Sequence, residues 1–177
     1  MRRPVVYVGR VSRAVALIAV VLAALVVAWT ARGGGEAPAR ELRGRVVRIT
    51  DGDTIRVALA GRTERVRYIG IDTPEEVRPD TPVQCYARRA AAENARLVAG
   101  REVRLVLDVE PRDRFGRLLA YVYRAGDGLF VNAELVRGGF ARTLTIPPNV
   151  RYAARFAALA RQARRAGRGL WSACPSA

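Results

Sequence analysis

Short runs in which apolar and polar residues alternate recur along the chain, as expected for strands that bury one face. The first three runs lie at residues 42–50, 54–60 and 64–71. Asp51-Gly52 separates the first two runs, and the turn at residues 60–62 separates the second from the third. Because Asp-Gly between alternating segments is typical of a hairpin, the pattern predicts a three-stranded meander.

Helix-forming residues then occupy positions 84–99 and end at Gly100. Two more strands are predicted at residues 103–109 and 117–123, followed by a short helix at residues 131–137. A longer helix is expected at residues 149–166, with Asn149 as its cap.

This order of elements favours an α+β fold with a mainly β core. Five short strands, with a helix inserted after the third, suit a small closed barrel of the oligonucleotide-binding (OB) type. We therefore predict a five-stranded OB-fold-like barrel with three packed helices.

The amino-terminal region differs from the rest of the chain. Residues 14–31 form an uncharged apolar stretch that follows four arginines. Its length lies between those of a signal peptide and a spanning helix, so either a signal peptide or a signal anchor at residues 1–31 fits. The arginines place the remainder outside the cytoplasm, secreted or anchored to the outer face of the membrane. The Gly- and Pro-rich residues 32–40 are expected to be a flexible linker, and residues 41–177 the folded domain.

The amino-acid composition limits the classes of function that the chain can have. The 177 residues, half of them apolar, suffice for one core, and we expect a monomer. The net charge is +15 and all 31 basic residues are arginine, which binds phosphate in a bidentate way and suggests a nucleic-acid partner. An arginine-rich proteome is the alternative. Histidine is absent, which excludes Ser-His-Asp triads and His-bearing zinc sites.

Cys85 and Cys174 are the only cysteines. In a domain placed outside the cytoplasm, an even number of cysteines favours a disulfide between them. It would tie the start of one helix to the end of the chain. Two unpaired buried thiols are the alternative.

Two acidic segments stand at strand ends, TDGDTI at residues 50–55 and YIGIDTPEE at residues 68–76. Each alone is a common turn sequence. Together they place Asp53 and Asp72 at neighbouring strand ends, beside Arg67 and near Glu75. Phosphodiester hydrolysis requires a group that activates water and positive charge against the phosphate, and a hard cation held by these carboxylates can share the second task with the adjacent arginine.

These motifs belong to a longer series: DGDT at 51–54, VRYIGIDTPE at 66–75, DRFGRLLAYVY at 113–123, VNAELVRGGFA at 131–141 and GLW at 169–171. With them, residues 43–172 resemble the staphylococcal nuclease (thermonuclease) family. The resemblance implies a five-stranded barrel with three helices. It also implies Ca²⁺-dependent cleavage of DNA and RNA at the bond between phosphorus and the 5′ oxygen, leaving 3′-phosphates.

The resemblance assigns roles to individual residues. Asp53 and Asp72 would bind Ca²⁺ through their carboxylates, and Thr73 through its backbone carbonyl. Glu75 would act as the general base or position the attacking water. The remaining two residues, Arg67 and Arg117, would hold the phosphate and stabilise the charge of the transition state.

The chain departs from the family in one region. Residues 142–149, RTLTIPPN, stand where the family often has tyrosines, and Phe115 stands where a tyrosine can occur. These changes leave nucleotide affinity and base preference open. Tyr121 and Tyr123 alternate with core positions, and we interpret them as packing residues.

Two other functions compete with a secreted nuclease. One is a catalytically silent nucleic-acid-binding module on the same barrel. The other is a membrane-anchored domain that captures DNA, which gains support if residues 14–31 remain attached.

Overall fold

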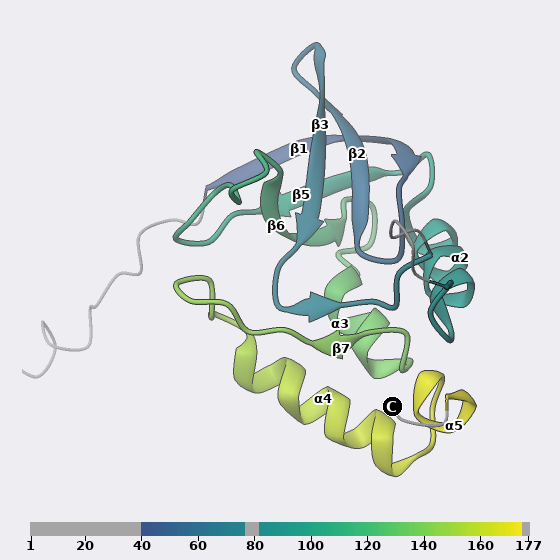
Figure 1. The fold of residues 1–177 in the computed structure, drawn as a ribbon. Coiled ribbons are helices and arrows are strands. Elements are labelled where there is room, and N and C mark those ends of the chain that lie inside the picture. Colours follow the sequence, from purple (N-terminus) through teal and green to yellow (C-terminus); the bar gives the residue numbers. More distant parts are fainter. Residues whose placement is uncertain (1–39, 77–81, 175–177) are drawn as a thin grey trace, which may run out of the picture. The chain divides into compact units, whose positions relative to one another are not determined.

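The computed structural model describes residues 40–76 and 82–174. Its centre is a closed barrel in the order β1-β2-β3-β6-β5, which confirms the predicted OB-like architecture (Figure 1). All neighbours are antiparallel except β3 and β6, which run parallel. The barrel strands are β1 Glu41–Ile49, β2 Thr54–Leu59, β3 Arg62–Tyr68, β5 Glu102–Val106 and β6 Leu118–Arg124.

Alternation along the strands sends every second side chain into the barrel. In β2, for example, Ile55 and Val57 are fully buried, whereas Arg56 between them is exposed. The loop between β2 and β3 has two residues, Ala60 and Gly61, both with positive φ. Such a turn matches the twist of the two strands and fixes their register.

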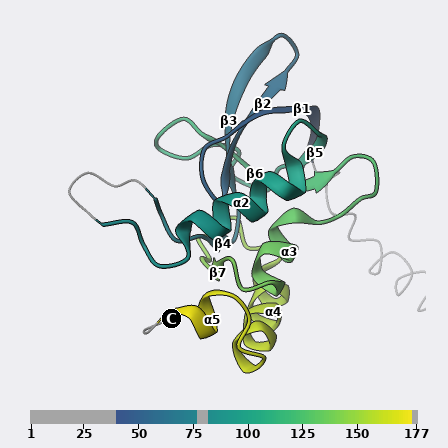
Figure 2. The ribbon, with the colours of Figure 1, turned by 90° about the vertical axis from the view of Figure 1, so that its right-hand side faces the viewer.

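Helices cover the barrel from two sides. Helix α2 (Ala87–Val98) lies against β1, and α3 (Val131–Arg137) lies against β6 (Figures 1 and 2). Helix α4 (Ala153–Arg165) packs on α3 and places Phe156 in an aromatic cluster with Tyr121. Tyr123 stacks on Phe130 of the same cluster, so both tyrosines of β6 pack as predicted.

The structure corrects several predicted boundaries. The third predicted strand, residues 64–71, ends at Tyr68, and its last residue belongs to a separate two-residue strand β4 (Ile71–Asp72) that pairs with β7 (Arg142–Thr143). The strand predicted at residues 103–109 ends at Val106, and Val109 beyond it is 71% exposed. A one-turn helix, α5 (Leu170–Ala173), was not predicted.

The predicted cap of helix α4 is wrong. Helix α4 begins at Ala153, after Tyr152, rather than at Asn149. The Asn149 side chain instead accepts a hydrogen bond from the main-chain N–H of Glu110 and donates one to its carbonyl, both at 2.8 Å. Asn149 therefore fastens two distant segments together and does not begin a helix.

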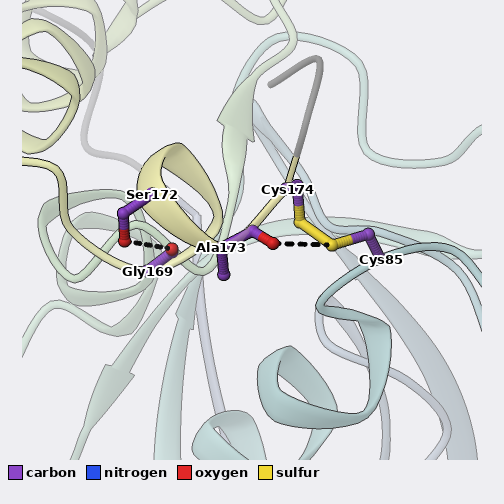
Figure 3. The surroundings of a disulfide bond; sticks show 5 residues. All are labelled: Cys85, Gly169, Ser172, Ala173 and Cys174. Carbon is purple, nitrogen blue, oxygen red and sulfur yellow. Dashed lines mark hydrogen bonds between the residues drawn. A yellow bond between two sulfur atoms is a disulfide. The ribbon is translucent and has the colours of Figure 1, made fainter.

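Cys85 and Cys174 form the predicted disulfide (Figure 3). Cys85 lies just before α2 and Cys174 just after α5, with Cα atoms 5.9 Å apart. The bond links the helix beside β1 to the last turn of the described chain.

No helix within residues 40–76 and 82–174 is both long and apolar enough to cross a bilayer. The predicted signal peptide or signal anchor at residues 14–31 lies outside the described residues, as does nearly all of the linker at residues 32–40.

Candidate active site

In the loop between β1 and β2, the side chain of Asp51 contacts the backbone of Asp53. The main-chain N–H of Asp53 donates a hydrogen bond of 2.9 Å to Oδ1 of Asp51. Gly52 between them is buried, and a Cβ there would lie 2.6 Å from Oγ1 of Thr73. The absence of a side chain at position 52 therefore lets the segment that carries Thr73 pack directly on this loop.

Thr73 follows β4 and fixes the Asp53 carboxylate. Its main-chain N–H and its hydroxyl both donate to Oδ2 of Asp53, at 2.7 and 2.9 Å. Two donors on one oxygen hold the carboxylate in a single orientation, and Asp53 is only 4% exposed. The carboxylate is thus a buried, preorganised group and not a solvated turn residue.

Arg67 of β3 lies between two acidic residues. Its guanidinium forms an ion pair with Asp53 and a hydrogen bond of 2.8 Å with Oδ1 of Asp72. Burial would lower the pKa of Arg67, but the charges of Asp53, Asp72 and Asp51 outweigh it and raise the pKa. Arg67 is therefore a permanent cation facing three aspartates.

The acidic side chains around Arg67 outnumber the basic ones. Burial and the neighbouring charge of Asp53 raise the pKa of Asp51 to about 6, although Arg67 acts in the opposite direction. Asn94 of α2 receives a hydrogen bond from the buried Tyr68 hydroxyl and donates one to the Asp51 carbonyl, both at 2.9 Å. The fold thus holds Asp51 close to Asp53 against electrostatic repulsion.

Arg117 is positioned by the loop before β6. Its Nε donates to Oδ2 of Asp113 at 2.6 Å, and its main-chain N–H donates to Oδ1 of the same residue at 2.9 Å. Burial would raise the pKa of Asp113, but the hydrogen bonds from Arg117 and from the Phe115 main chain outweigh it and lower the pKa. An ionised Asp113 therefore orients the Arg117 guanidinium.

Arg67 and Arg117 line the same cavity of about 480 Å³. Its apolar side includes Phe115, Leu144 and Ile146, which are 64%, 39% and 60% exposed. Two guanidinium groups next to exposed apolar side chains suit a ligand that combines a phosphate with a flat, weakly polar ring.

The structure brings together Asp53, Asp72, Thr73 and Arg67, and Arg117 lines the same cavity as Arg67. Glu75 is half-buried and is fixed through its main chain, with its N–H donating to Oε1 of Gln84 at 2.9 Å. It is not among the described residues that line the cavity.

No group of three or more acidic, Cys or His side chains within the described residues is arranged so that it could hold a metal ion. The donor set nevertheless has the chemistry that Ca²⁺ prefers, since Asp53 and Asp72 offer carboxylate oxygens and water or phosphate can complete the shell. Three aspartates facing one guanidinium also leave the negative charge that a cation would offset.

Sequence reasoning left out two residues that shape the site. In the sequence, Asp51 is part of a common turn and Asp113 is part of the DRFGRLLAYVY motif. The spacing of Asp113, four residues before Arg117, was the available signal for the second. No local signal distinguished Asp51 from Asp53, because both flank the same glycine.

Comparisons with known proteins identify the family to which the chain is similar. The family described as staphylococcal nuclease homologue matches residues 65–173. The thermonuclease of Staphylococcus hyicus is 39% identical over 141 residues, which cover 80% of this chain and 82% of that protein. The thermonuclease of Staphylococcus intermedius is 48% identical over 107 residues, covering 60% and 62%. An uncharacterized endonuclease of Escherichia coli is 38% identical over 138 residues, covering 75% and 78%.

Proposed function

The chain belongs to the staphylococcal nuclease family and is a phosphodiester hydrolase of nucleic acids, and we propose that it cleaves DNA and RNA with the help of Ca²⁺. In this proposal it breaks the bond between phosphorus and the 5′ oxygen and leaves 3′-phosphates. The observation that carries the proposal is the shared placement of Asp53, Asp72 and Arg67 next to a cavity that Arg117 also lines.

Asp53 and Asp72 would hold the cation through their carboxylates, and Thr73 through its main-chain carbonyl. A bound Ca²⁺ would supply positive charge against the phosphate oxygens. The hydrogen bonds from Thr73 to Asp53 preorganise one of these ligands before any substrate arrives. Such preorganisation lowers the reorganisation that must accompany reaction.

Arg67 and Arg117 would bind the phosphate and stabilise the charge that develops on it. Their guanidinium groups cannot lose the proton at neutral pH, and each is oriented by a carboxylate partner. The exposed apolar side chains of Phe115, Leu144 and Ile146 would contact the nucleoside. These side chains offer contact area but no hydrogen bonds to base edges, so we expect weak base preference.

Glu75 would take a proton from the attacking water or orient that water. The chain contains no histidine, so a carboxylate is the available base. Since Glu75 lies two residues beyond Thr73, it is near the proposed cation ligands along the chain.

We propose further that the enzyme works outside the cytoplasm, secreted or attached by residues 14–31. The disulfide between Cys85 and Cys174 supports this location, because such bonds persist in oxidising compartments.

The test uses the full chain with single-stranded DNA in Ca²⁺ and in EGTA. We expect cleavage only with Ca²⁺, and loss of cleavage on Asp53→Ala. Terminal phosphates should be found on the 3′ ends of the products. Cleavage in EGTA at the same rate would contradict the role of the cation.

The assignment of the base is tested by Glu75→Gln, with Glu76→Gln as the matched control. Both changes remove one carboxylate from neighbouring half-buried positions. Glu75→Gln should lower kcat at least about 100-fold and leave binding unchanged, whereas Glu76→Gln should leave both unchanged. Equal kcat values for the two variants would remove Glu75 from the mechanism.

A further inference from the structure

Three arginines that are not part of the cavity lining form a row across the barrel surface. Arg48 of β1 lies directly opposite Arg56 of β2, and Arg56 lies directly opposite Arg65 of β3. All three are exposed. These three strands are consecutive neighbours in the barrel, and Figure 1 shows β2 and β3 side by side. We call Arg48, Arg56 and Arg65 the arginine row.

The arginine row works against folding. Like charges directly opposite each other on neighbouring strands are destabilising, and guanidinium groups cannot relieve this by losing a proton. Other arginines of the same strands are paired, for example Arg45 with Glu102 and Arg62 with Glu64. Within the described part of the chain, the arginine row has no such ion pair. An external anion would remove the repulsion.

The row is continuous with the candidate active site. Arg65 and Arg67 are two residues apart in β3, so their side chains leave the same face of the strand, about 7 Å apart. The row itself crosses three strands, about 10 Å in all. One strand of a nucleic-acid duplex carries a phosphate about every 3.4 Å of helix axis, and because the strand winds around that axis the row can face about two to three successive phosphates.

We propose that the arginine row binds the sugar-phosphate backbone of a nucleic-acid substrate beside the phosphate that is cleaved. This inference rests on the proposed function for the class of substrate. The continuity with Arg67 favours nucleic acid over an anionic lipid surface, because a polyanion bound at Arg67 extends onto the row. The row then distinguishes long substrates from short ones.

The experiment compares two triple variants of the full chain. The first carries Arg48→Gln, Arg56→Gln and Arg65→Gln. The control removes three exposed arginines that have no ion pair in the described part of the chain and lie on α2 and α4: Arg88→Gln, Arg161→Gln and Arg165→Gln. Both variants change the net charge equally.

Binding to a 30-base-pair DNA is measured in EGTA, where the proposed cleavage cannot occur, over a range of salt concentrations. The slope of log affinity against log salt should fall in magnitude by about 2 to 3 in the row variant, since each phosphate contact contributes about 0.9. The control should change it by less than about 1. Equal slopes for the two variants would overturn the proposal.

Two further readouts separate the proposal from its premise. In Ca²⁺, the row variant should lose kcat/KM on the long DNA and keep it on a trinucleotide; equal losses on both would place the row in the reaction centre and overturn the proposal. If the wild-type chain cleaves neither the long DNA nor the trinucleotide while the salt slopes of the two variants differ as expected, that result would refute the proposed reaction and support the role of the arginine row in binding. Loss of binding to phosphatidylglycerol vesicles without loss of DNA binding would assign the row to lipid and overturn it.

Discussion

Asp51→Asn should stabilise the protein at neutral pH. Asp51 is partly buried and its carboxylate lies near the charge of Asp53, and together these raise its pKa from 3.8 to about 6. Asparagine has the same shape and keeps Oδ1 as the acceptor for the main-chain N–H of Asp53. The substitution therefore removes an unfavourable charge without removing the hydrogen bond.

The magnitude follows from linkage between protonation and folding. At about 1.4 kcal/mol for each pKa unit, a rise from 3.8 to about 6 makes the ionised Asp51 carboxylate about 3 kcal/mol less stable in the folded chain than in the unfolded chain. Below about pH 4 the group is protonated in both states and this cost nearly vanishes. The cost grows as the pH rises from 4 to 6 and is complete above pH 6.

Urea denaturation of wild type and Asp51→Asn at pH 4, 5, 6 and 8, in EGTA, measures the difference. We expect the variant to be more stable by about 3 kcal/mol at pH 8, roughly 10 °C in Tm, and by less than about 1 kcal/mol at pH 4. EGTA is needed because a bound cation would favour the charged carboxylate. A difference that is independent of pH would refute the electrostatic explanation.

Three other changes, one of them with a matched control, test the fold. Ala60→Asn should stabilise the protein by about 1 kcal/mol in urea denaturation, because asparagine tolerates the positive φ of this hairpin position better than alanine; a loss of stability would contradict the turn assignment. Cys85→Ser should lower the free energy of unfolding by about 4 kcal/mol, since the disulfide closes a loop across 89 positions. Reduction of the wild type should lower its Tm by as much as this substitution does. Tyr121→Phe should cost about 2 kcal/mol, because it removes a donor from the nearly buried carboxylate of Asp108. Tyr123→Phe is its control and should cost less, because its partner is another hydroxyl.

The barrel could be predicted because its signals are local. Alternating apolar residues and two glycine-containing turns are properties of short segments, and the five strands lie where these signals are strongest. Strands β4 and β7 could not be predicted, because two residues are too few to show a period. They form because Ile71 and Thr143 meet in the folded chain.

Side chains with distant partners were harder to place. Asn149 precedes a helix in sequence and resembles a cap, but its partner Glu110 lies 39 positions away. The clustering of Asp53, Asp72 and Arg67 was anticipated from two motifs and a family resemblance, whereas the ion pairs that Arg67 makes with both carboxylates could not be derived from spacing. The same limit applies to Asp51, whose orientation depends on contacts with α2.

The disulfide also determines when in the synthesis of the chain oxidation can take place. Cys85 can meet Cys174 only after 89 further residues have been synthesised and, in the proposed location, exported. A cysteine in a growing chain that still lacks its partner is open to pairing with other thiols. Correct oxidation of this protein therefore has to follow the arrival of its last helical turn, and a chain that stops before Cys174 would carry a single unpaired thiol.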